Sequence, residues 1–311
     1  MRKKMTAFVS LGLVCIPLFL SCETNQQTEE AQLNAALEKP EKIISTVKAA
    51  TLFNNDHTTR LSSIGKSKTT FEDKAIHFEL DVLTNYIQHL EKVAVSKKIP
   101  ITGVSFVFGT DAHGERTTFM MPSTRNAELD YQESFTIEND QFLTFRHIDT
   151  FLLASKTTGN DENLILSTEG YLSFNEAVTM FNRYQANYIE QIAVKVPRDF
   201  YTKAVWYSLD EINAYITYLK KKSNKHHLDI TGIDVFFGVY DKNPDLELKS
   251  NAQTVFLAAS TQNQTIINTK GTLLNDVLKN DDFHKNDATD NEEDESLAYN
   301  MGQLSPPPVT N

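Results

Sequence analysis

The sequence predicts an α+β fold made of two tandem copies of an α-β-α-β-β unit, preceded by an N-terminal signal and a tether. An internal repeat and the alternation of helical and strand patterns within each copy support this class. The composition agrees, because 40% hydrophobic residues in 311 are typical of a folded chain. The net charge of −11 argues against a nucleic-acid partner, which needs a basic surface.

The repeat is visible at an offset of 129 residues. Residues 74–109 match residues 203–238 at 13 of 36 positions without a gap. The match resumes downstream, where TTFMMPSTRN pairs with TVFLAASTQN, and it extends upstream, where STVKAATLFN pairs with SFNEAVTMFN. Three blocks in the same order indicate an internal duplication.

Residues 1–21 are interpreted as a signal peptide. Arg2 begins a basic stretch, an apolar run over 7–20 follows, and Ser21 precedes Cys22. This order is typical of secretory signals, and the apolar run is short for a membrane span. A Cys directly after a small residue resembles a bacterial lipoprotein signal, which implies cleavage before Cys22 and acylation of Cys22. An ordinary secretory signal cut nearby is the alternative.

Removal of the signal would leave an acidic chain that begins with a polar segment. Cys15 lies inside the signal, so the mature chain would have no thiol for a disulfide, a zinc–thiolate site or a nucleophile once Cys22 is acylated. We expect residues 22–43 to form a flexible tether, because they are almost entirely polar.

Repeat unit one is expected over residues 44–130. Its elements are a helix from Ser45 to about Ile64, a strand over 75–78, a second helix, and strands over 101–108 and 117–121. The second helix is marked by an apolar stripe at helical spacing, formed by Leu80, Leu83, Ile87 and Leu90.

Repeat unit two is expected over residues 171–265, after a partly packed connector over 131–170. Its two helices begin at capping boxes, in which Ser173 is followed by Glu176 and Ser208 by Glu211. The expected strands are 204–207, 230–237 and 254–258, with Trp206 buried. We expect the two copies to pack as a pseudo-two-fold pair that shares apolar faces.

The last part of the chain, 266–311, is expected to be an acidic, mostly disordered tail with a proline-rich end. Residues 276–295 hold nine acids and two lysines, and such runs are usually solvated. Residues 297–304 are apolar enough to pack back on the fold.

The repeat carries a resemblance to a known family. The residues in question are AVWYSL from Ala204, ITGI from Ile230 and TVFL from Thr254, with His77 in place of the Trp in the first copy. In this pattern the chain resembles a family of uncharacterised envelope-associated lipoproteins of Bacteroidota. The resemblance implies a location and an architecture, and it implies no activity. Ser305 stands where the family is expected to carry a cysteine beside the prolines.

The loop over 111–116 holds the candidate ligand-binding residues. Asp111, His113, Glu115 and Arg116 could converge at the end of two strands as ligands or as an acid–base pair. The alternative is a polar hairpin loop in which Asp and Gly serve the turn, and we favour it because the sequence places no second His nearby.

The sequence contains no nucleotide-binding glycine pattern, zinc spacing or catalytic-triad order, so no cofactor, metal or catalytic residue is predicted. We expect a non-enzymatic lipoprotein of the cell envelope, held to the membrane, the outer one by preference, through the Cys22 lipid. Its duplicated body would bind a protein partner or an envelope ligand. The alternative is an envelope hydrolase with its site at the 111–116 loop or in the groove between the copies.

Overall fold

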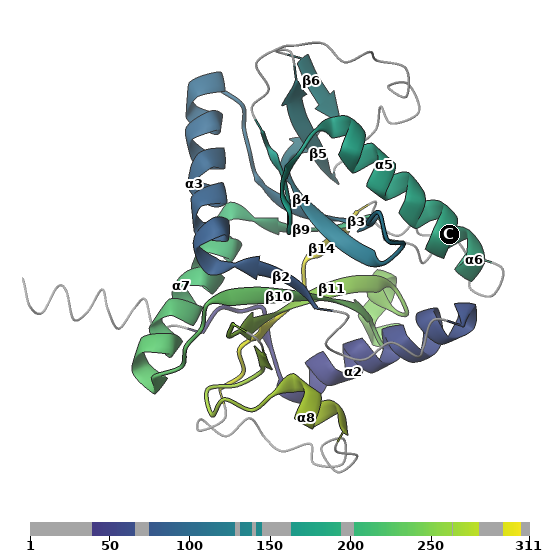
Figure 1. Ribbon diagram of the computed structural model, residues 1–311, viewed down its shortest axis with the longest axis vertical. Helices are drawn as coiled ribbons and strands as arrows, with labels where there is room; N and C mark the ends of the chain where they lie inside the picture. The colour runs from purple at the N-terminus through teal and green to yellow at the C-terminus, as the bar shows by residue number, and fades with distance from the viewer. Residues whose placement is uncertain are drawn as a thin grey trace, which may run out of the picture. The chain divides into compact units, whose positions relative to one another are not determined.

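The computed structural model describes residues 39–65, 75–127, 131–138, 141–144, 163–193, 202–262, 264–279 and 295–305. Within these residues the fold is mixed α+β, with helices and two antiparallel sheets (Figure 1). The expected signal, Cys22, most of the expected tether and most of the acidic run lie outside the described residues.

The first sheet, here the β10–β11 sheet, has the strand order β1 (Ile43–Ile44), β13 (Ala298–Tyr299), β11 (Gln253–Ser260), β10 (Gly232–Val239) and β2 (Ile76–Glu79), with β12 (Thr265–Ile266) also paired to β11. Its central pair comes from the second half of the chain, whereas β2 comes from the first half. Gly232 lies opposite Glu79, and Val235 lies opposite Ile76.

The second sheet, here the β3–β4 sheet, has the order β14 (Gln303–Ser305), β9 (Ala204–Ser208), β3 (Gly103–Thr110), β4 (Arg116–Asn126), β5 (Tyr131–Glu138) and β6 (Gln141–Thr144), while β7 (Ile165–Ser167) joins β4 to β8 (Gly170–Leu172). Here β9 comes from the second half and pairs with β3 of the first, with Gly103 opposite Ser208. Each half therefore gives its short strand to the sheet of the other half. The expected connector contributes β5 to β8, and β5 and β7 pair with β4.

The first helix of each half begins and ends where the sequence predicted. Helix α2 (Thr46–Asp56) follows the capping residue Ser45 and continues through a π-helical turn, η1 (His57–Leu61), and a 3₁₀ turn, η2 (Ser62–Ile64). Helix α5 (Phe174–Tyr184) follows a complete capping box and continues through the π-helical η5 (Gln185–Ile189) into α6 (Glu190–Ala193).

These two helices also cover the sheet of the opposite half. In α2, the Phe53 ring meets the Phe236 ring of β10 edge-on, with centroids 6.0 Å apart. Met180 of α5 packs closely against Gly109 of β3. A Cβ added to Gly109 would lie 3.3 Å from the Met180 Cβ. The exchange therefore involves a helix and a strand from each half.

The second helices, α3 (Leu80–Lys97) and α7 (Leu209–His226), lie side by side (Figure 1). The Asn213 side-chain amide donates to Glu91 across this contact at 3.2 Å. Each helix has 18 residues and ends at a left-handed residue, Lys98 at φ 56° and His227 at φ 55°. The predicted apolar stripe of α3 is buried, which confirms its orientation.

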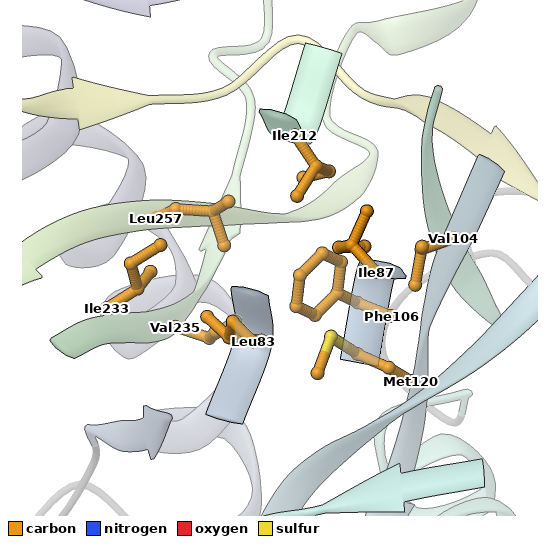
Figure 2. Close-up of a pocket in the computed structure, with 9 residues that line it drawn as sticks. All are labelled: Leu83, Ile87, Val104, Phe106, Met120, Ile212, Ile233, Val235 and Leu257. Carbon is orange, nitrogen blue, oxygen red and sulfur yellow. The ribbon is translucent and has the colours of Figure 1, made fainter. Parts of the chain in front are cut away.

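The main apolar core lies between the two sheets and against α3 and α7. It encloses a cavity of about 10 Å³, the lower limit for one water molecule (Figure 2). The lining is entirely apolar and consists of Leu83, Ile87, Val104, Phe106, Met120, Ile212, Ile233, Val235 and Leu257. We expect this cavity to contain no water, because a buried water molecule needs polar partners and the lining has none.

The C-terminal segment 297–304 packs on the fold, as its apolar character predicted. It supplies β13 to one sheet and β14 to the other. Between them, the Asn300 side chain accepts from the Tyr240 hydroxyl at 2.7 Å and donates to the Val255 carbonyl at 2.5 Å. Residues 265–279 are also ordered, as β12 and α8 (Leu274–Lys279). The expectation of a mostly disordered tail therefore does not hold for 266–279 and 295–305, where buried apolar side chains anchor the chain.

Candidate functional site

The hairpin that joins β3 to β4 holds three of the predicted ligand-binding residues. The Asp111 carboxylate accepts the backbone N–H groups of His113 and Glu115, both at 2.9 Å. The side chains of His113 and Glu115 are exposed. This arrangement is an Asx-type turn, so Asp111 shapes the loop in the way the alternative interpretation predicted.

The fourth predicted residue, Arg116, points away from this loop into the protein. Its guanidinium donates to both carboxylate oxygens of Asp56, at 3.0 and 2.5 Å. It also lies 4.2 Å from the centroid of the Phe237 ring. The structure therefore does not bring the four residues together, because Arg116 is held in a buried bidentate ion pair instead.

The second half has a hydrogen bond in the corresponding place. Tyr184, the last residue of α5, donates its hydroxyl to the Gln253 side-chain oxygen at 2.9 Å. Burial raises the pKa of Tyr184 above the ordinary value for tyrosine. The Arg60 guanidinium completes this region by donating to the Asn251 carbonyl at 2.7 Å. The Arg116–Asp56 and Tyr184–Gln253 bonds each tie the first helix of a half to a strand of the same half, whereas the Arg60–Asn251 bond joins the two halves.

The candidate site lies elsewhere, around His77 of β2, and the sequence did not single it out. The His77 Nδ1 lies 2.8 Å from the Asp234 carboxylate of β10 and 3.2 Å from the Ser260 hydroxyl of β11. The Nε2 faces the Glu79 carboxylate, with 3.5 Å between nitrogen and oxygen. Thr265 donates its hydroxyl to the other Asp234 oxygen. The strand exchange creates the site, since His77 and Asp234 come from different halves.

The imidazole of His77 is fixed in one orientation. Its ring lies over Gly232, where a Cβ would be only 2.3 Å from Cε1. The Asp234 side chain is 6% exposed, whereas the His77 side chain is 36% exposed. The hydrogen bond to Asp234 raises the pKa of His77, and partial burial opposes that rise. In the tautomer whose Nδ1 donates to the Asp234 carboxylate, Nε2 is the basic atom of the neutral ring.

This set of residues is not a serine-hydrolase triad. In a triad the base contacts the serine through one ring nitrogen and the carboxylate through the other. Here Ser260 and Asp234 both face Nδ1. What the geometry offers is a fixed imidazole whose Nε2 lies beside a carboxylate, an arrangement that can hold a proton or a cation.

The same place in the β3–β4 sheet carries no ionisable group. There Trp206 of β9 lies opposite Ser105 of β3, as His77 lies opposite Asp234. The Ser105 hydroxyl bonds to Ser123 at 2.6 Å, and the Trp206 ring lies over Gly103. Trp206 is half-buried rather than buried as predicted. The difference between His77 and Trp206 was a signal in the sequence that could have marked the site.

No family model, curated protein or solved structure matches the chain. No helix in the described ranges has the length and apolarity needed to span a membrane. Among the same residues, no three or more His, Cys, Asp or Glu side chains gather in a way that would hold a metal.

Proposed function

We propose that this chain is a non-enzymatic, lipid-anchored protein of the cell envelope whose body binds a protein partner or an envelope ligand. The observation that carries the anchor is the N-terminal order of Arg2, an apolar run and Ser21-Cys22, followed by a polar segment. A polar segment of that length can hold a folded body away from a membrane surface.

We infer further that the body consists of two copies of one unit. The paired helices and strands support this, because α3 and α7 have 18 residues each, β3 and β10 eight, and α2 and α5 eleven. The five-residue π-helical turns η1 and η5 also follow α2 and α5 at equivalent points. The short strand of each copy completes the sheet of the other.

The geometry favours binding over the alternative of a hydrolase. Asp111 is engaged in its own turn, and Arg116 is engaged with Asp56. The space between the halves is filled by apolar side chains around a cavity of about 10 Å³. Neither place offers a nucleophile and base in contact, which acyl transfer or hydrolysis would need.

The anchor is tested by metabolic labelling with an alkyne fatty acid in a bacterial host, comparing wild type with Cys22→Ser. We expect label on the wild type and none on Cys22→Ser. Cys15→Ser is the matched control and should keep the label, since Cys15 lies in the segment that is removed. Equal labelling of wild type and Cys22→Ser, or none on either, would refute the anchor.

The binding role is tested by cross-linking of the tagged chain in cells, followed by purification and mass spectrometry. A reproducible, stoichiometric envelope partner supports the proposal. Substrate turnover by the purified chain that His113→Ala abolishes would overturn it in favour of the hydrolase.

A further inference from the structure

We propose that the contact between His77 and Asp234 is a pH-sensitive link between the two halves of the chain. A protonated imidazole holds β2 of the first half against β10 of the second half, and loss of the proton weakens that contact. This inference goes beyond the proposed function and depends neither on the lipid anchor nor on a binding partner. It rests on the surroundings of the ring, on the burial of its carboxylate partner and on the contrast with the other sheet.

The ring of His77 faces two carboxylates, one at each nitrogen. Asp234 of β10 lies 2.8 Å from Nδ1, and Glu79 of β2 itself lies 3.5 Å from Nε2. The hydroxyl groups that complete the site, those of Ser260 and Thr265, carry no charge. Among the residues that the structure describes, neither carboxylate forms an ion pair with a lysine or an arginine. The protonated imidazole is therefore the cation that balances both carboxylates.

The burial of Asp234 makes the contact sensitive to the charge of the ring. The Asp234 side chain is 6% exposed, so water does little to stabilise its charge. Tyr215 of α7 also acts on Asp234, but burial raises the pKa of Tyr215 well above its ordinary value, and this hydroxyl stays neutral. A hydrogen bond to a carboxylate is stronger when its donor is charged. Loss of the His77 proton therefore leaves the buried carboxylate with a weaker partner.

The contact lies where it can hold the exchanged strand in place. β2 has four residues, and His77 lies directly opposite Asp234 in its pairing with β10. Side chains that lie opposite one another on neighbouring strands contribute much of the stability of a sheet. Within the described part of the chain β2 is the last strand of its sheet, whereas the corresponding β9 is flanked by both β3 and β14. The pairing of β2 therefore depends on contacts to β10 alone.

The other sheet forms the same pairing without an ionisable contact. There Trp206 and Ser208 of β9 take the places of the two ionisable residues of β2, and Ser105 of β3 takes the place of Asp234. None of these three side chains changes its charge near neutral pH. The pH effect is therefore confined to one of the two exchanged strands, the one at the edge of its sheet.

The direction of the pH effect follows from the pKa of His77. The hydrogen bond to Asp234 raises this pKa above its ordinary value, partial burial opposes the rise, and Glu79 adds to it. In the unfolded chain the pKa of a histidine is about 6.5. The stabilisation is therefore complete below about pH 6.5 and is lost as the pH rises through the folded-state pKa. Each unit between the two pKa values corresponds to a tenfold change in the unfolding equilibrium constant.

The test measures the pKa of His77 and the pH dependence of stability separately, in the full-length chain purified in detergent. Nitrogen NMR of labelled histidines gives the folded-state pKa, which we expect above 6.5 in the wild type. Asp234→Asn should lower it most, and Glu79→Gln should lower it less. Urea unfolding from about pH 5 to about pH 9 should show a loss of stability that is absent in His77→Gln and equal in size to the loss calculated from the measured pKa. The matched control His113→Gln should behave like the wild type.

Three results would overturn the proposal: a wild-type His77 pKa at or below 6.5, a His77 pKa unchanged in both Asp234→Asn and Glu79→Gln, or the same pH dependence of stability in wild type and His77→Gln. The first result needs no variant, so the test stands even if a substitution at the buried Asp234 misfolds. Glu79 is 61% exposed, so Glu79→Gln should keep the fold. Cys22→Ser should titrate like the wild type, which separates failure of this contact from failure of the anchor.

Discussion

Replacing Arg116 with Gln is expected to remove about 3–5 kcal/mol from the free energy of unfolding, because it leaves the Asp56 carboxylate buried without its partner. The Arg116 and Asp56 side chains are 8% and 4% exposed, so water cannot replace the two lost hydrogen bonds. For a chain of this size, that loss corresponds to a fall in Tm of about 6–20 °C.

The corresponding hydrogen bond in the second half suggests a second substitution that should restore part of the stability lost in Arg116→Gln. Tyr184 and Gln253 occupy the places of Asp56 and Arg116 and form a neutral hydrogen bond. The double variant Asp56→Tyr with Arg116→Gln should therefore be more stable than Arg116→Gln alone, with a coupling energy of about 0.5–3 kcal/mol. Arg125→Gln on the exposed face of the same strand is the control and should change stability by less than about 0.5 kcal/mol.

The stability of the wild type, the two single variants Asp56→Tyr and Arg116→Gln, the double variant and the control is measured by urea unfolding, followed by far-UV circular dichroism and by the fluorescence of the single tryptophan. The reasoning would be refuted if Arg116→Gln and Arg125→Gln had the same small effect. It would also fail if the effects of Asp56→Tyr and Arg116→Gln were simply additive, since the two residues are in direct contact.

Two further predictions concern the C-terminal segment and the buried tyrosines. Gly302→Ala should destabilise the fold by about 1–3 kcal/mol, because the new Cβ would lie 2.4 Å from the Val205 Cγ1 and 2.8 Å from the Tyr207 Cζ. An unchanged Tm, with unchanged proteolysis of the C-terminal segment, would contradict it. Burial raises the pKa of Tyr218 and of Tyr240 to about 12. Because these pKa values lie above the unfolded value of about 10, the stability they contribute is intact below pH 10 and is lost as pH rises toward 12. In the native chain, the absorbance of ionised tyrosine should therefore rise only above pH 10, together with unfolding. In urea, where the tyrosines are exposed, the same absorbance should rise near pH 10. Ionisation of all tyrosines near pH 10 without loss of structure would show that they are not buried.

The helices were predictable because their signals are local. Ser208 and Glu211 form the capping box that starts α7, and the stripe containing Leu83 and Leu90 determines which face of α3 is buried. The six strands expected within the two units were also found within a few residues, whereas those of the connector, β5 to β8, were not predicted. The partners of the six strands were not found, because alternation determines the two faces of a strand and leaves its neighbour undecided. Nothing near β2 in the sequence indicates that it pairs with β10.

The same reason explains the site. Arg116 was grouped with Asp111 because the two are neighbours in the sequence, but the first residue of β4 turns inward to Asp56. His77 and Asp234 are 157 positions apart, so only the pairing of β2 with β10 reveals their contact. The sequence offered one clue: His77 in the first half stands where the matching segment of the second half has Trp206.

The exchange of strands also determines the order in which the chain can mature. About 150 residues separate β2 from β10, and at about 5–20 residues per second a ribosome needs about 8–30 s to make them. During that interval β2 and α2 have no sheet to join, and β3 and β4 await both β9 and α5. A chain interrupted after its first half exposes an open strand edge and an uncovered apolar face, which are the features that proteases and aggregation exploit. Completion of the second half is thus a condition for the native state of the first.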